Sequence, residues 1–230
     1  MSTHNSPANI MELQQIETYL NSPDAQNRIR GIVGLRNHSP EVAVPLLKKR
    51  MYDREFMIRS YVAMGFGYKQ TEEGFQSLLD IIANEKDPNV RAEAANSLAK
   101  YGLERALPYL ERLFEQESHW LVRQSIFAVI EEVIDSKMLL RICQIGLEGR
   151  DPLVKQTAVS QLGRLSNTSQ KVVALEMLLP FVKSDVWQMR SRVANVLRKF
   201  DSLPEAQEAL SQLRQDPDYR VVAAILEGCL

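Results

Sequence analysis

A basic residue recurs along this chain at a nearly constant interval, and the residues around it recur with it. Successive members lie 31, 32, 32, 32, 35 and 30 residues apart. The members are Arg28, Arg59, Arg91, Arg123, Lys155, Arg190 and Arg220. A fixed period of about 20 to 50 residues is typical of repeat proteins, in which each unit buries its apolar face against its neighbours. The repeat therefore constrains the architecture more strongly than any single motif does.

Each basic residue lies one turn into the second helix of its unit. Residues 87–101 read DPNVRAEAANSLAKY and residues 151–165 read DPLVKQTAVSQLGRL. An aspartate four residues before the basic residue can accept hydrogen bonds from free N–H groups at the helix start, and proline suits the first helical position. These start signals are Asp24, Asp87, Asp151 and Asp216, with Pro88, Pro152 and Pro217.

Apolar residues at helical spacing between these turns predict a first helix in each unit. The expected ranges are about 10–21, 40–52, 72–85, 104–117, 136–149, 169–183 and 204–215. Pro180 comes late in its segment and is expected to kink or end the helix, because proline cannot donate the backbone hydrogen bond. We expect an all-α fold, a superhelical solenoid of about seven helical hairpins, running as one array over residues 10–230 after a disordered tail at residues 1–9.

Composition narrows the class of protein. The formal net charge is −1 and the sequence pI is about 6.3, whereas a nucleic-acid-binding surface usually carries a basic stripe. No apolar run approaches the roughly 20 residues that span a bilayer, and the N-terminus lacks the pattern of a signal peptide. We expect a cytoplasmic protein that neither binds nucleic acid nor inserts into a membrane.

The two cysteines are far apart and have neither metal-ligand nor disulfide spacing. The repeat register places Cys143 where other units have core leucines, so we expect a buried structural thiol. Cys229 takes an outward position, which makes it either an exposed reactive thiol or an inert terminal residue. The sequence predicts no metal site from these residues.

The basic series admits two interpretations. Seven cations stacked along one edge of the array could form a ligand-binding ladder. Alternatively, each cation lies near the carboxylate of the preceding turn and ties adjacent units together by hydrogen bonds. We favour this structural ladder.

Large aromatic residues replace proline in three of the turns: Phe56, Trp120 and Trp187. If the turns line one rim, these rings could bind a partner protein or a flat conjugated ligand. Alternatively, each ring folds back over its own hairpin as a lid.

The outward positions of the second helices differ between units. The second unit has Tyr61, Met64 and Tyr68 there, which marks a candidate interface, whereas later units present polar residues that include Arg164, Arg192 and Lys199. The last unit, RVVAAILEGCL, places Val222 and Ile225 at these positions without a polar capping helix. We therefore expect self-association into a homodimer through the C-terminal unit. The alternative is that the register drifts in this terminal helix.

The repeated aspartate, proline, apolar and Arg/Lys turn followed by an alanine-rich helix resembles the HEAT repeats, and in particular the short HEAT-like repeats named after phycobilisome lyases. SHWLVRQSIFAVIEEV at 118–133 and VWQMRSRVANVLRKF at 186–200 are similar to the cyanobacterial phycobilisome-degradation family of the non-bleaching B type. That family is related to the E and F subunits of phycocyanobilin lyases, which attach bilins to phycobiliproteins.

This resemblance implies a non-catalytic scaffold that binds a protein partner, a phycobiliprotein or its bilin, in phycobilisome turnover or assembly. It leaves two alternatives open, a bilin lyase or chromophore-detaching enzyme, and an accessory protein for an iron–sulfur cluster bridging two chains through Cys229. The sequence offers no catalytic residue for either, since nucleophile elbow, phosphate loop and HExxH motifs are missing. The expected binding residues are the rim aromatics, the second-unit cluster and the three later cations named above.

Overall fold

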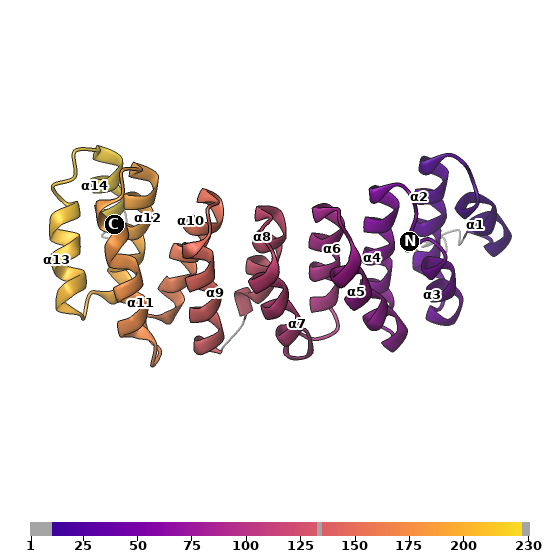
Figure 1. Ribbon diagram of the computed structural model, residues 1–230, viewed down its shortest axis with the longest axis horizontal. Coiled ribbons are helices and arrows are strands. Elements are labelled where there is room, and N and C mark those ends of the chain that lie inside the picture. Colours follow the sequence, from indigo (N-terminus) through magenta and orange to yellow (C-terminus); the bar gives the residue numbers. More distant parts are fainter. Residues whose placement is uncertain (1–10, 133–134, 227–230) are drawn as a thin grey trace, which may run out of the picture. The chain divides into compact units, whose positions relative to one another are not determined.

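The computed structural model describes residues 11–132 and 135–226, and every regular element in those residues is a helix (Figure 1). The first helices of the hairpins are α1 (Leu13–Leu20), α3 (Pro40–Lys48), α5 (Glu72–Asn84), α7 (Leu103–Gln116), α9 (Ser136–Glu148), α11 (Lys171–Leu178) and α13 (Pro204–Leu213). The second helices are α2 (Ala25–Gly34), α4 (Phe56–Lys69), α6 (Pro88–Ala99), α8 (Trp120–Val129), α10 (Pro152–Leu162), α12 (Trp187–Leu197) and α14 (Tyr219–Leu226). The expected all-α hairpin array is confirmed, whereas the tail at 1–9 and Cys229 lie outside the described residues.

Short 3-10 helices extend several of these elements. They are η1 (Leu35–Asn37), η2 (Ile130–Glu132), η3 (Gly163–Leu165), η4 (Leu179–Lys183) and η5 (Arg198–Phe200). Pro180 lies at the start of η4, directly after α11 ends at Leu178. The predicted helix end at Pro180 is confirmed, because the chain tightens there instead of continuing the α-helix.

The chain divides into two compact units. The first holds the described residues up to Leu113 together with Ala128–Ile130, and the second holds Phe114–Phe127 and the residues from Glu131 on. The single continuous array over residues 10–230 therefore stays a prediction.

In the first unit, the second helices α2, α4 and α6 pack side by side in chain order (Figure 1). α4 buries Val62, Ala63 and Phe66 completely, which are spaced to lie on one face of the helix. Gly67 brings α4 against α6, since a Cβ atom there would lie 2.6 Å from Ser97 Oγ. This close packing fixes which face of α4 remains at the surface.

In the second unit, α10 packs against α9 and α12, and α12 packs against α14. Phe127 on α8 is buried and meets Phe114 edge to face, with ring centroids 5.0 Å apart. Cys143 on α9 is fully buried, as its register predicts, and burial raises the pKa of its thiol to about 12. The thiol is therefore a core side chain.

Most of the predicted helix starts are confirmed. Asp24, Asp87 and Asp151 accept hydrogen bonds from N–H groups at the start of α2, α6 and α10. The last repeat differs: Asp218, not Asp216, accepts from the N–H of Arg220 at the start of its helix. Pro217 accordingly precedes α14 and is not its first residue. The shorter interval before this unit moves its start signal by two residues.

The prediction for the outer face of α14 is wrong at Ile225. This side chain is 3% exposed, together with buried Val221 and Ala224, whereas Tyr219 and Leu226 are exposed. α14 begins at Tyr219 and packs against α12, and this rotation turns Ile225 inward. Val222 is half-buried. Of the two side chains on which the expected homodimer was based, Ile225 is therefore buried within the unit.

Candidate functional site

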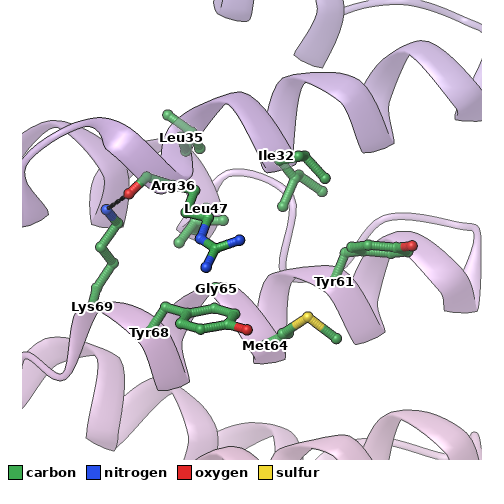
Figure 2. A pocket seen from close by; sticks show the side chains of 10 residues that line it. Ile32, Leu35, Arg36, Leu47, Tyr61, Met64, Gly65, Tyr68 and Lys69 are labelled. Carbon is green, nitrogen blue, oxygen red and sulfur yellow. Dashed lines mark hydrogen bonds between the residues drawn. The ribbon is translucent and has the colours of Figure 1, made fainter. Parts of the chain in front are cut away.

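A pocket of about 130 Å³ opens between α2, η1 and α4 in the first unit (Figure 2). Its floor is apolar and includes Ile32, Leu35 and Leu47. Gly65 lets the Leu47 side chain approach α4, because a Cβ atom on Gly65 would lie 2.9 Å from the Leu47 methyl groups. The pocket thus exists because two packed helices meet over a glycine.

One wall of the pocket is the face of α4 opposite its buried stripe. Tyr61, Met64 and Tyr68 line it, and Figure 2 shows them in succession along the helix. Tyr61 and Met64 are half-buried, whereas 54% of Tyr68 is exposed. The structure therefore brings together the three residues of the second-unit cluster and leaves part of their apolar surface at the solvent.

Two cations contact the ring of Tyr68. The guanidinium carbon of Arg36 lies 5.3 Å from the ring centroid, and Lys100 Nζ lies 4.6 Å from it. Both distances are within the range of cation–π attraction. Tyr68 is consequently held in place although it is exposed, which lowers the entropy that a ligand would lose by ordering it.

Lys69 closes the pocket at the end of α4. Its ammonium donates hydrogen bonds to the backbone carbonyls of Arg36, at 2.9 Å, and of His38, at 2.5 Å. Burial lowers the pKa of the Lys69 ammonium. These bonds tie α4 to η1, and the charge of Arg36 stays available at the mouth of the pocket.

Sequence reasoning missed Arg36, Lys69 and Lys100 at this site. Tyr68 lies nine residues after Arg59, at a position that faces outward from its helix. Arg36 lies eight residues after Arg28, one residue before the corresponding position of the first unit. Lys100 takes the same offset in the third unit that Tyr68 takes in the second. The signal was present in the register, but the side-by-side packing of second helices was needed to join these residues.

The three rim aromatics begin their helices, as the register predicts, but their surroundings differ. Phe56 and Trp120 are about two-fifths exposed, at 41% and 42%. Trp120 stacks on its neighbour His119 with ring centroids 6.0 Å apart. The ring of Trp187 is covered by Arg220 of the following repeat at 3.5 Å, so it serves the packing of the last two hairpins.

The later cations Arg164, Arg192 and Lys199 lie in the second unit. Arg192 reaches from α12 to α10 and donates a hydrogen bond to Ser160 Oγ at 2.8 Å. Arg164 donates to Gln161 Oε1 at 2.9 Å, and Lys199 is exposed. Arg192 thus links α12 to α10, and Lys199 presents positive charge at the surface.

The basic series forms ion pairs between repeats, with one correction to the expected geometry. Arg28 pairs with Asp53, Arg59 with Glu85, and Arg190 with Asp216, in each case a carboxylate from the following turn. Where the preceding turn carries the expected aspartate, as at Asp24 before Arg28, that carboxylate caps its own helix instead. The preceding turn contributes backbone carbonyls, such as those of Ser22 and Pro23 to Arg28.

Arg91 likewise donates to carbonyls of the preceding turn, those of Glu85 and Lys86. Arg220 differs, because it pairs with Asp218 of its own turn. Arg123 and Lys155 are half-buried. Within the described residues no cluster of three or more His, Cys, Asp or Glu side chains could hold a metal ion, and no helix there is long and apolar enough to cross a membrane.

Helical hairpins joined by a repeated arginine–carboxylate link define an α-helical repeat protein. The HEAT repeats family matches residues 44–131 and 141–229, so the chain belongs to the HEAT-repeat family. No curated protein matches it in sequence.

The solved structures that are similar to this chain include the following two. YibA from E. coli is 15% identical, with 93% of this chain and 80% of that chain covered and a TM-score of 0.63. The complex of CpcE and CpcF of phycocyanin lyase from Nostoc sp. PCC7120 is 18% identical, with 100% of this chain and 98% of that chain covered and a TM-score of 0.51. At these identities the likeness shows the fold alone.

Proposed function

We propose that this chain is a non-catalytic interaction scaffold that binds a phycobiliprotein, or its bilin, through the surface formed by α2 and α4. The observation that carries the proposal is the exposed ring of Tyr68, held by Arg36 and Lys100 beside an apolar pocket. An apolar floor, an aromatic wall and cations at the mouth suit a ligand that is both conjugated and anionic.

A bilin has these properties, because it is a conjugated tetrapyrrole with propionate groups. Its rings would stack on Tyr68 and Tyr61, and a propionate would pair with Arg36. The pocket itself is smaller than such a chromophore, so the ligand would lie along the surface with one part inserted. A bilin carried at the surface of a protein partner fits this arrangement better than a fully enclosed free bilin.

The likeness to a lyase complex of two subunits supports a protein partner but not lyase activity in this chain. The residues that line the α2–α4 pocket include no His, Cys, Asp or Glu, and the Cys143 thiol is in the core. A bilin-attaching enzyme would need reactive groups there or on the partner. Turnover assays for bilin attachment and release distinguish the two functions, and product formation would favour the lyase.

The binding test mixes the chain with phycocyanin and, separately, with phycocyanobilin, and follows co-elution and the absorbance spectrum. Tyr68→Ala should weaken binding by about tenfold or more, because aromatic anchors at interface centres often contribute about 2 kcal/mol or more. Tyr52→Ala is the matched control, since Tyr52 is 76% exposed and does not line the α2–α4 pocket. Separate elution and unchanged spectra with both ligands would reject the proposal.

A further inference from the structure

One of the links between repeats joins Arg59 to Glu85. Arg59 Nε donates to Glu85 Oε2 at 2.5 Å, and a terminal nitrogen of Arg59 donates to Oε1 at 3.0 Å. Glu85 Oε1 also accepts from the backbone N–H groups of Lys86 and Asp87, both at 2.8 Å. One carboxylate thus satisfies a guanidinium from the preceding repeat and two N–H groups of its own turn.

Two repeats later, Gly149 occupies the position of Glu85. Glu85 is the C-cap residue of α5 and its N–H donates to the carbonyl of Ile81, while Gly149 is the C-cap residue of α9 and its N–H donates to the carbonyl of Ile145. The backbone of Gly149 has φ −59° and ψ 170°, which any residue adopts. The backbone conformation therefore does not require glycine at position 149. Compared with the repeat of Glu85, this repeat lacks the carboxylate.

The repeat of Gly149 still has the hydrogen-bond donors that Glu85 satisfies in its own repeat, but it has no glutamate at this position to accept from them. Arg123 is the counterpart of Arg59, and its Nε is buried with no hydrogen-bond partner. Arg28 Nε also lacks an aligned hydrogen bond, but it faces Asp53 Oδ2 at 2.9 Å. No carboxylate of the described residues lies at ion-pair distance from Arg123, whose guanidinium carbon instead lies 5.0 Å from the centroid of the Phe114 ring.

The N–H groups of Arg150 and Asp151 correspond to those of Lys86 and Asp87, and neither has an acceptor among the described residues. Burial lowers the pKa of the Arg123 guanidinium, and the charge of Glu117 opposes this. A guanidinium stays protonated in proteins, so Arg123 is a partly desolvated cation without a bonded counter-ion.

The missing side chain leaves room for a ligand. An open pocket of about 500 Å³ lies beside Arg123 and Gly149, and the exposed Arg150 adds a second cation to it. Two carboxylates are near: Asp151 accepts from the N–H groups of Leu153 and Val154 at the start of α10, and buried Glu117 accepts from the N–H groups of its own turn. Both carboxylates accept hydrogen bonds from backbone N–H groups of their own turns, as the carboxylate of Asp87 does two residues after Glu85.

We propose that this pocket binds a carboxylate from outside the fold, in the place that Glu85 fills within its own repeat. The Arg123 guanidinium and the N–H groups of Arg150 and Asp151 donate to the bound group. The carboxylate belongs either to a small organic acid or to an acidic side chain of a protein partner. The site lies apart in sequence from the α2–α4 surface and does not depend on the function proposed for it.

The test follows the Arg123 Nε–H signal and the backbone N–H signals of Arg150 and Asp151 by NMR during titration with succinate. Saturable shifts of all three signals are expected, and they should be much larger than the shifts caused by sodium chloride at the same ionic strength. The absence of saturable shifts, or equal shifts with chloride, would overturn the proposal.

Gly149→Glu supplies the carboxylate within the chain and should weaken succinate binding by about tenfold or more, because it satisfies the same charge-assisted donors. A Cβ atom at this position would lie 2.8 Å from a terminal nitrogen of Arg123, a flexible group that can shift. Gly149→Gln is the matched control of equal size without the charge, and its melting temperature should stay below that of Gly149→Glu. Equal melting temperatures and unweakened binding in Gly149→Glu would contradict the proposal.

Titration with an acidic peptide, blocked at both ends, identifies the source of the carboxylate. Tighter binding of the peptide than of succinate supports an acidic side chain of a partner. Equal or weaker binding of the peptide supports a small organic acid. Both results require the same three signals to shift.

Discussion

The guanidinium of Arg28 and the carboxylate of Asp53 lie 25 residues apart in sequence and form an ion pair that is almost excluded from water. Arg28 Nε lies 2.9 Å from Oδ2, and a terminal nitrogen donates to Oδ1 at 3.0 Å. Their side chains are 5% and 6% exposed. Because a buried charge without its partner is costly, the two residues depend on each other for the packing of the first two hairpins.

Asp53→Asn should lower the free energy of unfolding by about 3 kcal/mol, since it leaves the Arg28 charge buried and unneutralised. Urea unfolding followed by circular dichroism measures the effect. Glu73→Gln is the matched control, because the pair of Lys48 and Glu73 is half exposed and its loss should cost less than about 1 kcal/mol. Equal losses in the two variants would contradict the distinction between buried and exposed pairs.

The pair of Arg190 and Asp216 predicts a dependence of stability on pH. The Arg190 guanidinium, which donates to both carboxylate oxygens, holds the pKa of Asp216 below its ordinary value. A carboxyl group whose pKa is lower in the folded than in the unfolded protein stabilises the fold. This stabilisation is fully present above the pKa of the unfolded state, about 3.9, and is lost as the pH falls through the pKa of the folded state.

Asp216→Asn should therefore be less stable than the wild type at pH 7, and the difference should narrow as the pH falls below about 4. Unfolding curves at a series of pH values from 7 to 3 measure it. Comparison of the two proteins at each pH cancels the titration of the other carboxylates. A difference that stays constant down to pH 3 would show that the charge of Asp216 does not stabilise the fold.

The Cys143 thiol should be unreactive in the folded protein. It is fully buried and its pKa is raised to about 12, so that only about one thiol in 10,000 is ionised at pH 8. In a Cys229→Ser variant, a disulfide reagent should label no thiol under native conditions and one thiol in denaturant. Rapid labelling of the folded variant would place Cys143 at an accessible surface.

Gly67→Ala should destabilise the first unit by about 1 to 3 kcal/mol, because overpacking forces helices apart. The added Cβ atom would lie 2.7 Å from Ser97 Cβ and 3.0 Å from its Cα, so the backbone of α6 would have to move. Gly163→Ala is the matched control, since its nearest atoms belong to the side chains of Lys199 and Val196 at 3.2 Å. Similar stability of the two variants would show that α4 and α6 adjust freely.

The sequence alone predicted the all-α repeat, the alternation of first and second helices, and the helix starts at Asp24, Asp87 and Asp151. These features depend on residues within one or two turns of each other, where helical periodicity and capping operate. The last repeat shows the limit of this reasoning. A change of two residues in the interval moved its start signal from Asp216 to Asp218 and turned Ile225 inward.

The tertiary structure decided which groups from different repeats meet. Local pattern placed Tyr61, Met64 and Tyr68 on one face of a helix, but the contacts of Arg36 and Lys100 with Tyr68 depend on how neighbouring second helices stack. The register of the basic residues likewise did not show that their carboxylates come from the following turn. That pairing depends on the packing of successive hairpins, and it is this packing that leaves Arg123 facing Gly149 in place of a carboxylate.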